Sequence, residues 1–374
     1  MIPKRFTLAI VAMFVGIAVH NSIGGLVYFG TYTGAKSQGI YVSRFDPATG
    51  RLSAPELAVK TPNPTFLAVS PGEHFLYAVN EVSDDSTVSA FALDAKTGKL
   101  TLLNQQASGG SGPCHLAVDA TGKCLLVANY NSGSIATLPI HNNGTLGEAT
   151  TIQHTGSSTN HERQAGPHAH SIYLSPDNRF ALNCDLGLDK VFVYRLDAEA
   201  AKLSPNDPPF ATVAPGSGPR HLVFSADGKF VYVINEMGGT ITVFNYNATN
   251  AAMAEVQTIS TLPKDFSGAN TAAEIALHPS GKFLYASNRG HDSIALFDVD
   301  EKTGRLTLVE HQSTQGRAPR HFAIDPTGHW LLAENQASDS VVVFAIDSST
   351  GKLKPTGQAL SIGSPVCAVF VSEN

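Results

Sequence analysis

A small set of residues in this sequence has the chemical types needed to bind and activate an oxygen-rich small molecule. The set contains His170, Arg220, Glu236, Arg289 and Arg320. An arginine guanidinium is a planar fork of donors that can hold a carboxylate or a phosphate with two hydrogen bonds. A histidine or a glutamate beside such arginines can serve as a general base. These side chains therefore indicate a catalytic or binding site, provided that the fold brings them together.

The fold is indicated by a repeat of about fifty residues that runs from about Gly24 to the C-terminus. Each repeat has an apolar run, an Asp-Gly-type turn and a second apolar run, which together predict an antiparallel hairpin. A third apolar run follows, often with an Asp-x-x-Thr-Gly-x-Leu turn into a fourth strand. The clearest copies of the hairpin are residues 64–81, 219–236 and 319–336, with looser copies beginning at residues 113, 169 and 272.

Four antiparallel strands repeated radially are typical of a β-propeller. We predict an all-β, seven-bladed propeller over residues 24–374, without an amphipathic helix. Six hairpins are complete within the sequence, and the seventh blade is divided between the two ends of the domain. Residues 365–371 should supply its inner strand, and residues 26–52 should supply the others, which closes the ring without an open sheet edge.

Hairpin geometry places the start of the first strand and the end of the second at the end opposite the turn. In every blade these two positions should line one mouth of the central channel. The residue after the leading proline and the residue that ends the second strand vary strongly in charge, and they include all five residues named above. An asparagine or aspartate stands just before the residue that ends the second strand. Its side chain should form hydrogen bonds with local backbone groups.

The residue that follows the first of these positions is expected to point the opposite way, because side chains alternate along a strand. It is His115, His221 and His321 in three blades, which we interpret as packing and hydrogen-bonding residues. The arginines have a structural alternative too, in which they pair with Glu81, Glu236 and Glu274 and link the blades together.

A long polar connection, residues 154–170, differs from the other links between blades, and loops of this kind are often functional. It contains Arg163, His168 and His170. Metal binding by the two histidines is an alternative, but alternate residues of a strand converge on one ion only at a bulge or turn. The site prediction therefore contains no metal and no cofactor.

The N-terminal segment departs from the repeat. Lys4 and Arg5 precede an apolar run at residues 6–19, which is too short for a comfortable membrane span and fits a signal peptide over residues 1–23. A retained anchor and a misplaced start are the alternatives. Export predicts a periplasmic or secreted domain, and otherwise the protein is cytoplasmic. The four cysteines have no spacing typical of a disulfide framework or a zinc site, and they should be buried thiols.

A net charge of −6 gives no general attraction to nucleic acid or to an anionic membrane. We therefore expect a small-molecule partner, with no membrane contact beyond the N-terminal segment.

Several motifs closely resemble the seven-bladed propeller lactonase family, which includes propeller-type 6-phosphogluconolactonases and carboxy-cis,cis-muconate cyclising enzymes. They are Arg163-Gln-Ala-Gly-Pro-His-Ala-His170, Gly218-Pro-Arg-His221, Ile234-Asn-Glu236 and Ser287-Asn-Arg-Gly-His291. The resemblance covers about residues 25 to 374. It implies a metal-independent site with His170, Arg220, Glu236 and Arg289 as catalytic residues, and His168 is the alternative for the first. The predicted signal peptide departs from what the resemblance implies, because a 6-phosphogluconolactonase acts on a sugar phosphate and sugar phosphates are cytosolic metabolites.

Three functions follow from these observations. The first is hydrolysis of a sugar lactone, with His168, Arg320, Arg163 and Glu81 binding the substrate and Glu236 or His170 activating water. The second is cyclisation of an unsaturated dicarboxylate to a muconolactone. The third is an exported propeller that binds a ligand or a protein without catalysis, which mutual pairing of the charged residues would favour.

Overall fold

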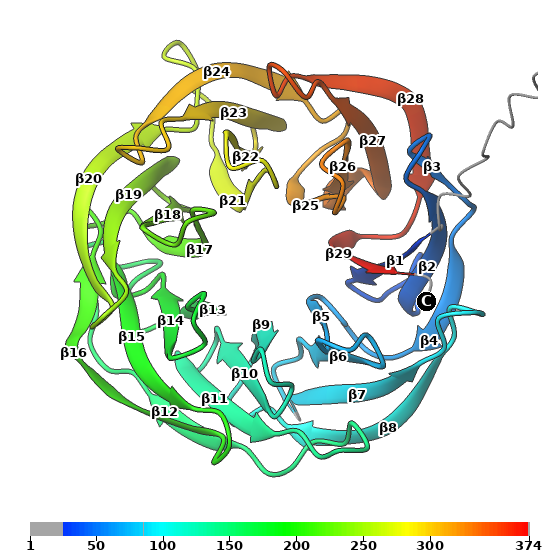
Figure 1. Cartoon of the computed structure of the whole chain (residues 1–374), viewed down its shortest axis with the longest axis horizontal. Helices are drawn as coiled ribbons and strands as arrows, with labels where there is room; N and C mark the ends of the chain where they lie inside the picture. Colours follow the sequence, from blue (N-terminus) through cyan, green and yellow to red (C-terminus); the bar gives the residue numbers. More distant parts are fainter. Residues whose placement is uncertain (1–24, 85, 373–374) are drawn as a thin grey trace, which may run out of the picture.

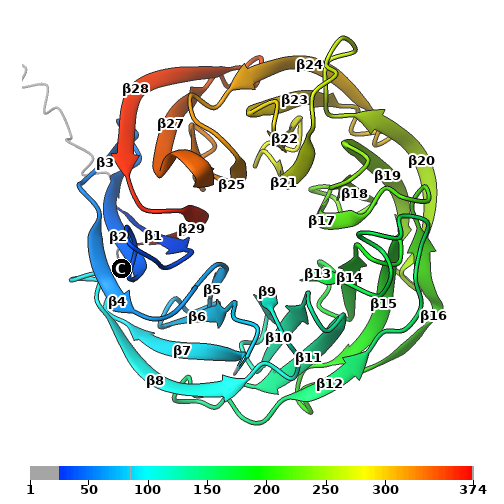
Figure 2. The same ribbon diagram turned by 180° about the vertical axis from the view of Figure 1, so that it is seen from behind.

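The computed structural model describes residues 25–84 and 86–372, and these residues form a ring of seven blades (Figures 1 and 2). Each blade is an antiparallel sheet whose first strand lines the channel and whose last strand lies at the rim. This arrangement confirms the predicted seven-bladed, all-β propeller. The predicted signal segment, residues 1–23, lies outside the described residues.

The six continuous blades follow the chain order. From the channel outward they are blade 1, β5 (Leu67–Val69), β6 (Phe75–Asn80), β7 (Thr87–Leu93) and β8 (Leu100–Ala107); blade 2, β9 (Pro113–Val118), β10 (Cys124–Asn129), β11 (Ser134–Pro139) and β12 (Thr150–Gln153); blade 3, β13 (Ala169–Leu174), β14 (Phe180–Asp185), β15 (Lys190–Asp197) and β16 (Lys202–Thr212); blade 4, β17 (Pro219–Phe224), β18 (Phe230–Asn235), β19 (Thr240–Asn247) and β20 (Ala252–Ser260); blade 5, β21 (Thr271–Leu277), β22 (Phe283–Arg289), β23 (Ser293–Val299) and β24 (Leu306–Ser313); and blade 6, β25 (Pro319–Ile324), β26 (Trp330–Asn335), β27 (Ser340–Ile346) and β28 (Leu353–Ser361).

Blade 7 joins the two ends of the described chain, as predicted. Its inner strand β29 (Pro365–Ser372) pairs with β1 (Gly25–Thr31), which pairs with β2 (Gly39–Asp46). Its outer edge is shared by β3 (Arg51–Leu52) and β4 (Glu56–Lys60), both paired with β2. Figure 1 shows β29, in red, beside β1, in blue. The hydrogen bonds between β29 and β1 therefore close the ring.

The strand sequences follow from the position of each strand in the blade. Second strands such as β10 and β18 are buried at every residue, because neighbouring blades cover both of their faces. Their sequences are accordingly continuous apolar runs. The outer strands β8 and β20 have one face in solvent and contain polar residues throughout. Apolar clusters between adjacent blades form the core, such as the one that joins Val191 and Val193 of blade 3 to Val231 and Val233 of blade 4.

At three of the turns between a third and a fourth strand, a glycine carbonyl accepts a hydrogen bond from a tyrosine of the neighbouring blade. The Tyr285 hydroxyl donates to the carbonyl of Gly351 at 2.6 Å, and Tyr28 and Tyr77 make equivalent bonds to Gly98 and Gly144. Gly351 has a φ of +69°, and a Cβ there would lie 2.6 Å from the ring of Phe283. Glycine is therefore required at this turn both for its backbone conformation and for its contact with the next blade.

Within the described residues the one helix is the three-residue η1 (Gln336–Ser338), and no helix there has the length and apolarity needed to cross a membrane. All four cysteines are buried free thiols, as predicted.

A β-bulge near the start of the first strand shapes the mouth of the channel. In blade 4, Pro219 pairs with Asn235 and His221 pairs with Ile234, so Arg220 has no partner across the ladder. The same irregularity leaves one residue unpaired at the same position of four other blades: Cys114, His170, Arg320 and Val366. Bulges of this kind re-aim side chains.

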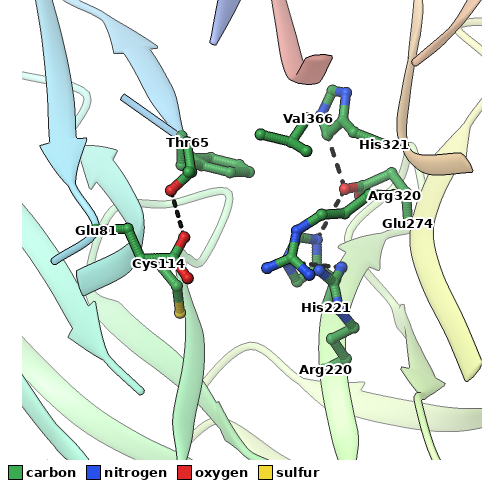
Figure 3. A pocket seen from close by; sticks show the side chains of 10 residues that line it. Thr65, Glu81, Cys114, Arg220, His221, Glu274, Arg320, His321 and Val366 are labelled. Carbon is green, nitrogen blue, oxygen red and sulfur yellow. Dashed lines mark hydrogen bonds and ion pairs between the residues drawn. The ribbon is translucent and has the colours of Figure 1, made fainter. Parts of the chain in front are cut away.

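The bulge overturns one prediction. His221 and His321 do not point away from their neighbours Arg220 and Arg320, because all four side chains line the same central pocket (Figure 3). Strand alternation fails here because the extra residue shifts the side-chain direction by one position. The histidines do pack and form hydrogen bonds, as predicted, but they do so inside the channel.

Candidate active site

Glu236, directly after β18, is the centre of the candidate site. Its Oε1 accepts a hydrogen bond from Arg163 Nη2 at 2.8 Å, and its Oε2 accepts one from Arg220 Nε at 3.1 Å. Arg289 Nη2 forms an ion pair with Oε2 at 2.9 Å. Burial alone would raise the pKa of Glu236, but the three arginines hold it at about 2. Glu236 is therefore a carboxylate at neutral pH, and a weak base.

The three arginines differ in their exposure to solvent. The side chain of Arg220 is 3% exposed, that of Arg289 is 14% exposed and that of Arg163 is 40% exposed. Arg220 Nη1 also donates to the carbonyl of Ala273 at 2.7 Å, and Arg289 Nη2 donates to that of Ala272 at 3.2 Å. Burial lowers the pKa of Arg289 to about 10, so it remains charged at neutral pH. The mouth thus contains three arginine cations whose side chains range from almost fully buried to partly exposed.

His170 lies in the bulge of β13, with its Nε2 4.0 Å from Glu236 Oε2. Its Nδ1 is buried and has no hydrogen-bond partner among the described residues. Burial, followed by the nearby charge of Arg220, holds the pKa of His170 well below its usual range. The ring is therefore neutral at physiological pH and keeps a lone pair that can accept a proton.

A second group at the mouth contains Glu81 and Arg320, which both contact Tyr32. The carboxylate of Glu81 accepts hydrogen bonds from the hydroxyls of Tyr32 and Thr65. Arg320 lies over the ring of Tyr32, with its guanidinium carbon 5.6 Å from the ring centroid. No hydrogen bond or ion pair of Arg320 occurs among the described residues. Tyr32 and Glu81 raise its pKa, against the opposing effect of burial. Arg320 is therefore a cation available to a ligand.

Figure 3 shows the central pocket, with Thr65 and Glu81 on one side and Arg220, His221, Glu274 and Arg320 on the other. Its free volume of about 10 Å³ suits roughly one water molecule. A larger ligand must therefore lie above it, against the half-buried side chains at the rim. The pocket is lined by Thr65, Phe66, Glu81, Cys114, Arg220, His221, Glu274, Arg320, His321 and Val366.

The long connection between β12 and β13 folds over the mouth and delivers Arg163 and His168. His168 stacks on Tyr130, with ring centroids 4.5 Å apart, and Arg163 also donates to the Tyr130 hydroxyl at 3.1 Å. Asp185 Oδ1 accepts the backbone N–H of His168 at 2.8 Å, and Asp185 Oδ2 lies 2.7 Å from Nδ1 of the buried His154. Asp185 thus fastens both ends of this connection to blade 3.

Replacing Asp185 with alanine should loosen this connection. Arg163 is its one trypsin site, and loss of two charge-assisted hydrogen bonds should speed cleavage there by about tenfold or more. Any activity of the site should fall in parallel, because Arg163 and His168 lose their fixed positions. Limited proteolysis with identification of the cut site measures the first effect. Asn335→Ala is the matched control, because Asn335 holds the equivalent link of blade 6 through the Thr314 carbonyl. Equal cleavage rates in both variants would contradict this role of Asp185.

The equivalent asparagines confirm the prediction of local backbone bonding. Asn80, Asn129, Asn288 and Asn335 each donate to a backbone carbonyl of the connection that precedes their own blade. Asn235 differs, because it donates to the hydroxyls of Thr240 and Thr242. These bonds fix the strand ends from which the site residues project.

The structure thus brings His170, Arg220, Arg289 and Arg163 together around the carboxylate of Glu236, and it places Arg320 and Glu81 beside Tyr32. Arg163, Arg220 and Arg289 pair with Glu236, as in the structural alternative. Arg320 forms no ion pair with a glutamate among the described residues. Glu274 pairs with His221 instead of an arginine side chain. The described residues contain no group of three or more His, Cys, Asp or Glu side chains placed to hold a metal ion.

Comparison with known proteins adds the family. Residues 26–370 match the family model described as "Lactonase, 7-bladed beta-propeller". The chain is 37% identical, over 79% of its length and 83% of the relative, to a 6-phosphogluconolactonase of Bacillus subtilis.

Two solved structures are similar over almost the whole chain. One is a putative 6-phosphogluconolactonase of Bacteroides fragilis, with 39% identity, a TM-score of 0.89 and coverage of 94% of this chain and 99% of that one. The other is a periplasmic gluconolactonase of Pseudomonas aeruginosa, with 36% identity, a TM-score of 0.89 and coverage of 94% and 100%.

Proposed function

Because the chain belongs to the seven-bladed β-propeller lactonase family, we propose that it hydrolyses the ring ester of a sugar lactone. The convergence of three arginines and a neutral histidine on one mouth of the channel carries this proposal. Pairing among charged residues alone would also suit a binding platform. The family match and the unpaired Arg320 favour an enzyme.

In the proposed reaction a water oxygen attacks the lactone carbonyl carbon, and His170 accepts the proton of that water. Arg220 and Arg289 donate hydrogen bonds to the carbonyl oxygen as it becomes an oxyanion. Collapse of the tetrahedral intermediate breaks the ring C–O bond, and His170 returns the proton to the departing ring oxygen. The product is an open-chain hydroxy acid, which releases a proton to solvent.

Of the two candidate bases, we assign this role to His170 and not to Glu236. Both oxygens of Glu236 are already bound by arginines, whereas Nδ1 of His170 has no hydrogen-bond partner among the described residues. Glu236 instead holds the three guanidinium groups close together despite their mutual repulsion. Its negative charge is therefore needed for the geometry of the site.

We assign Arg320 to the part of the substrate away from the reacting carbonyl, with Glu81 near Arg320 and with His168 contacting the substrate from its position on Tyr130. For a phosphorylated lactone, Arg320→Ala should raise KM about 10- to 100-fold, because a hydrogen bond to a charged group is lost. For the unphosphorylated lactone the rise should be less than about threefold. Steady-state kinetics on both substrates measures the difference. Arg179→Ala on the exposed turn is the control, since Arg179 pairs there with Asp177. An equal change for both lactones would exclude Arg320 as an anion-binding residue.

Localisation bears on the substrate. We propose export, from the charged and apolar pattern of residues 1–23 and from the similarity to a periplasmic gluconolactonase. An exported enzyme would not meet cytosolic sugar phosphates, so an unphosphorylated sugar lactone is then its substrate.

The direct test is acid release by the purified domain from δ-gluconolactone, 6-phosphogluconolactone and a muconolactone, measured against the spontaneous rate. Hydrolysis of either sugar lactone supports the proposed function. Turnover of the muconolactone alone favours the cyclising reaction, and no turnover in the whole panel favours a binding protein.

A further inference from the structure

A second carboxylate lies beneath the mouth, and the proposed reaction leaves it without a role. Glu274, on β21, is buried, and its Oε2 lies 2.9 Å from Nδ1 of His221 on β17. Figure 3 shows Glu274 and His221 close to Arg220 on one side of the central pocket. A carboxylate on Nδ1 accepts the proton of that nitrogen, so the other ring nitrogen, Nε2, carries the lone pair.

The lone pair of His221 faces Arg220. Nη1 of Arg220 lies 3.4 Å from His221 Nε2 and donates to the Ala273 carbonyl at 2.7 Å. Nε of the same guanidinium donates to Glu236. Two sides of the Arg220 guanidinium are therefore fixed. Its Nε is bound by Glu236, and its Nη1 is bound by the Ala273 carbonyl of β21 and lies next to His221.

Glu274 is itself fixed by the irregular start of β21. The ladder skips Ala273 and Glu274 between the Ala272–Asn288 and Ile275–Ala286 pairs. The free backbone N–H of Glu274 donates to the Ser287 hydroxyl at 2.9 Å, and Ile275 N–H donates to Glu274 Oε1 at 3.0 Å. One bulge thus presents both the Ala273 carbonyl and the Glu274 carboxylate toward Arg220 and His221.

Glu274 also contributes to the charge balance around Arg220. Arg220 is almost fully buried, and a buried guanidinium is costly unless it is paired. Its direct partner Glu236 is shared with Arg163 and Arg289. Burial and the charge of Arg320 lower the pKa of Arg220, whereas Glu236 and Glu274 act in the opposite direction. Glu274 therefore supplies negative charge that Glu236 alone does not provide.

We propose that Glu274, acting through His221, is a positioning residue that holds the Arg220 guanidinium in the orientation needed to stabilise the oxyanion. This inference rests on the proposed lactonase function. Glu274 does not contact the lactone, so its contribution appears in the rate of the chemical step and not in substrate affinity.

The matched control is a second buried carboxylate–histidine pair in the same channel. Glu334 Oε2 lies 2.7 Å from His321 Nδ1, and no arginine forms a hydrogen bond or ion pair with either residue among the described contacts. Replacing Glu334 with glutamine changes a buried carboxylate one histidine away from Glu274, since His321 Nε2 lies 3.7 Å from Glu274 Oε2, and it leaves the contacts of Arg220 itself in place. It should alter kcat by less than about twofold.

The experiment is a double-mutant cycle on the full domain, with Glu274→Gln, His221→Phe and the double variant. Glu274→Gln should lower kcat about tenfold or more and change KM less than threefold. In the His221→Phe background the same substitution should have almost no further effect, because Glu274 acts through the imidazole. Independent, multiplicative losses or an unchanged kcat in Glu274→Gln would overturn the proposal.

A measurement on the unmodified protein keeps the inference testable if a variant does not fold. Nitrogen-15 NMR of the histidines should show His221 as the neutral tautomer with its proton on Nδ1. The opposite tautomer or an imidazolium at neutral pH would overturn the role. Failure of the inference is also distinct from failure of the proposed function. Normal kcat in Glu274→Gln with an inactive Arg220→Ala overturns only the former, whereas an unmodified protein without lactonase activity overturns both.

Discussion

Replacing Arg220 with alanine should lower kcat/KM for the sugar lactone by a factor of about 100 to 1,000, the usual loss when one oxyanion donor is removed. Arg220 is the most deeply buried of the three arginines around Glu236. Arg163 and Arg289 remain to neutralise Glu236 in the variant, so the propeller should still fold.

Initial rates of acid release, with circular dichroism to verify folding, measure this effect. Arg220→Lys tests geometry against charge, because lysine restores the cation but not the planar fork. It should recover only a small part of the activity. The surface variant Arg179→Ala should retain the full rate. A folded Arg220→Ala protein with an unchanged rate would remove Arg220 from the catalytic residues.

Replacing Glu236 with glutamine should have the largest effect on stability. The substitution preserves the shape of the side chain and leaves three arginines close together without their shared anion. A carboxyl whose pKa falls from 4.5 to about 2 on folding contributes about 3 kcal/mol to the unfolding free energy. Breaking a buried ion pair from one side costs a similar amount. Urea unfolding at pH 7 should therefore show a loss of about 3 kcal/mol, and lactonase activity should fall at least about a hundredfold.

The same cluster predicts a pH dependence. Because the pKa of Glu236 is lower in the folded state than in the unfolded state, its contribution is complete above about pH 4.5 and is lost as the pH falls toward 2. The difference in unfolding free energy between the unmodified protein and Glu236→Gln should be constant near neutral pH. It should shrink progressively between pH 4.5 and pH 2. A difference that does not vary with pH would show that the carboxylate charge does not stabilise the cluster.

The repeat made the fold predictable from sequence. An internal alignment of hairpins identified the strands, the turns and the shared seventh blade, because each blade solves the same packing problem with the same apolar pattern. It also identified the mouth, since the positions next to Asn80, Asn235 and Asn335 vary where the framework does not require one residue type. The predicted range of blade 7, residues 26–52, was wrong at its outer edge, because most of that edge is formed by β4 at Glu56–Lys60; a rim strand exposes much of its surface and carries little apolar signal.

The contacts within the site were less predictable. The bulge at Arg220 reverses the expected direction of His221, and no local sequence signal marks an extra residue in a strand. The pairing of Arg163 with Glu236 joins residues 73 positions apart, and it depends on the path of a long loop. Arginine side chains also have many rotamers, so spacing could not distinguish the paired Arg289 from the unpaired Arg320.

Closure of the ring by β29 and β1 has a consequence for the timing of activity during synthesis. The last described strand, β29, supplies Val366 to the central pocket, and Tyr32 of the mouth is held by its backbone bond to Ser364. A nascent chain that already contains His170, Arg220, Glu236 and Arg289 therefore still has an unfinished mouth. Catalytic competence therefore requires that β29 has been synthesised and has paired with β1, so enzymatic activity reports that the ring has closed.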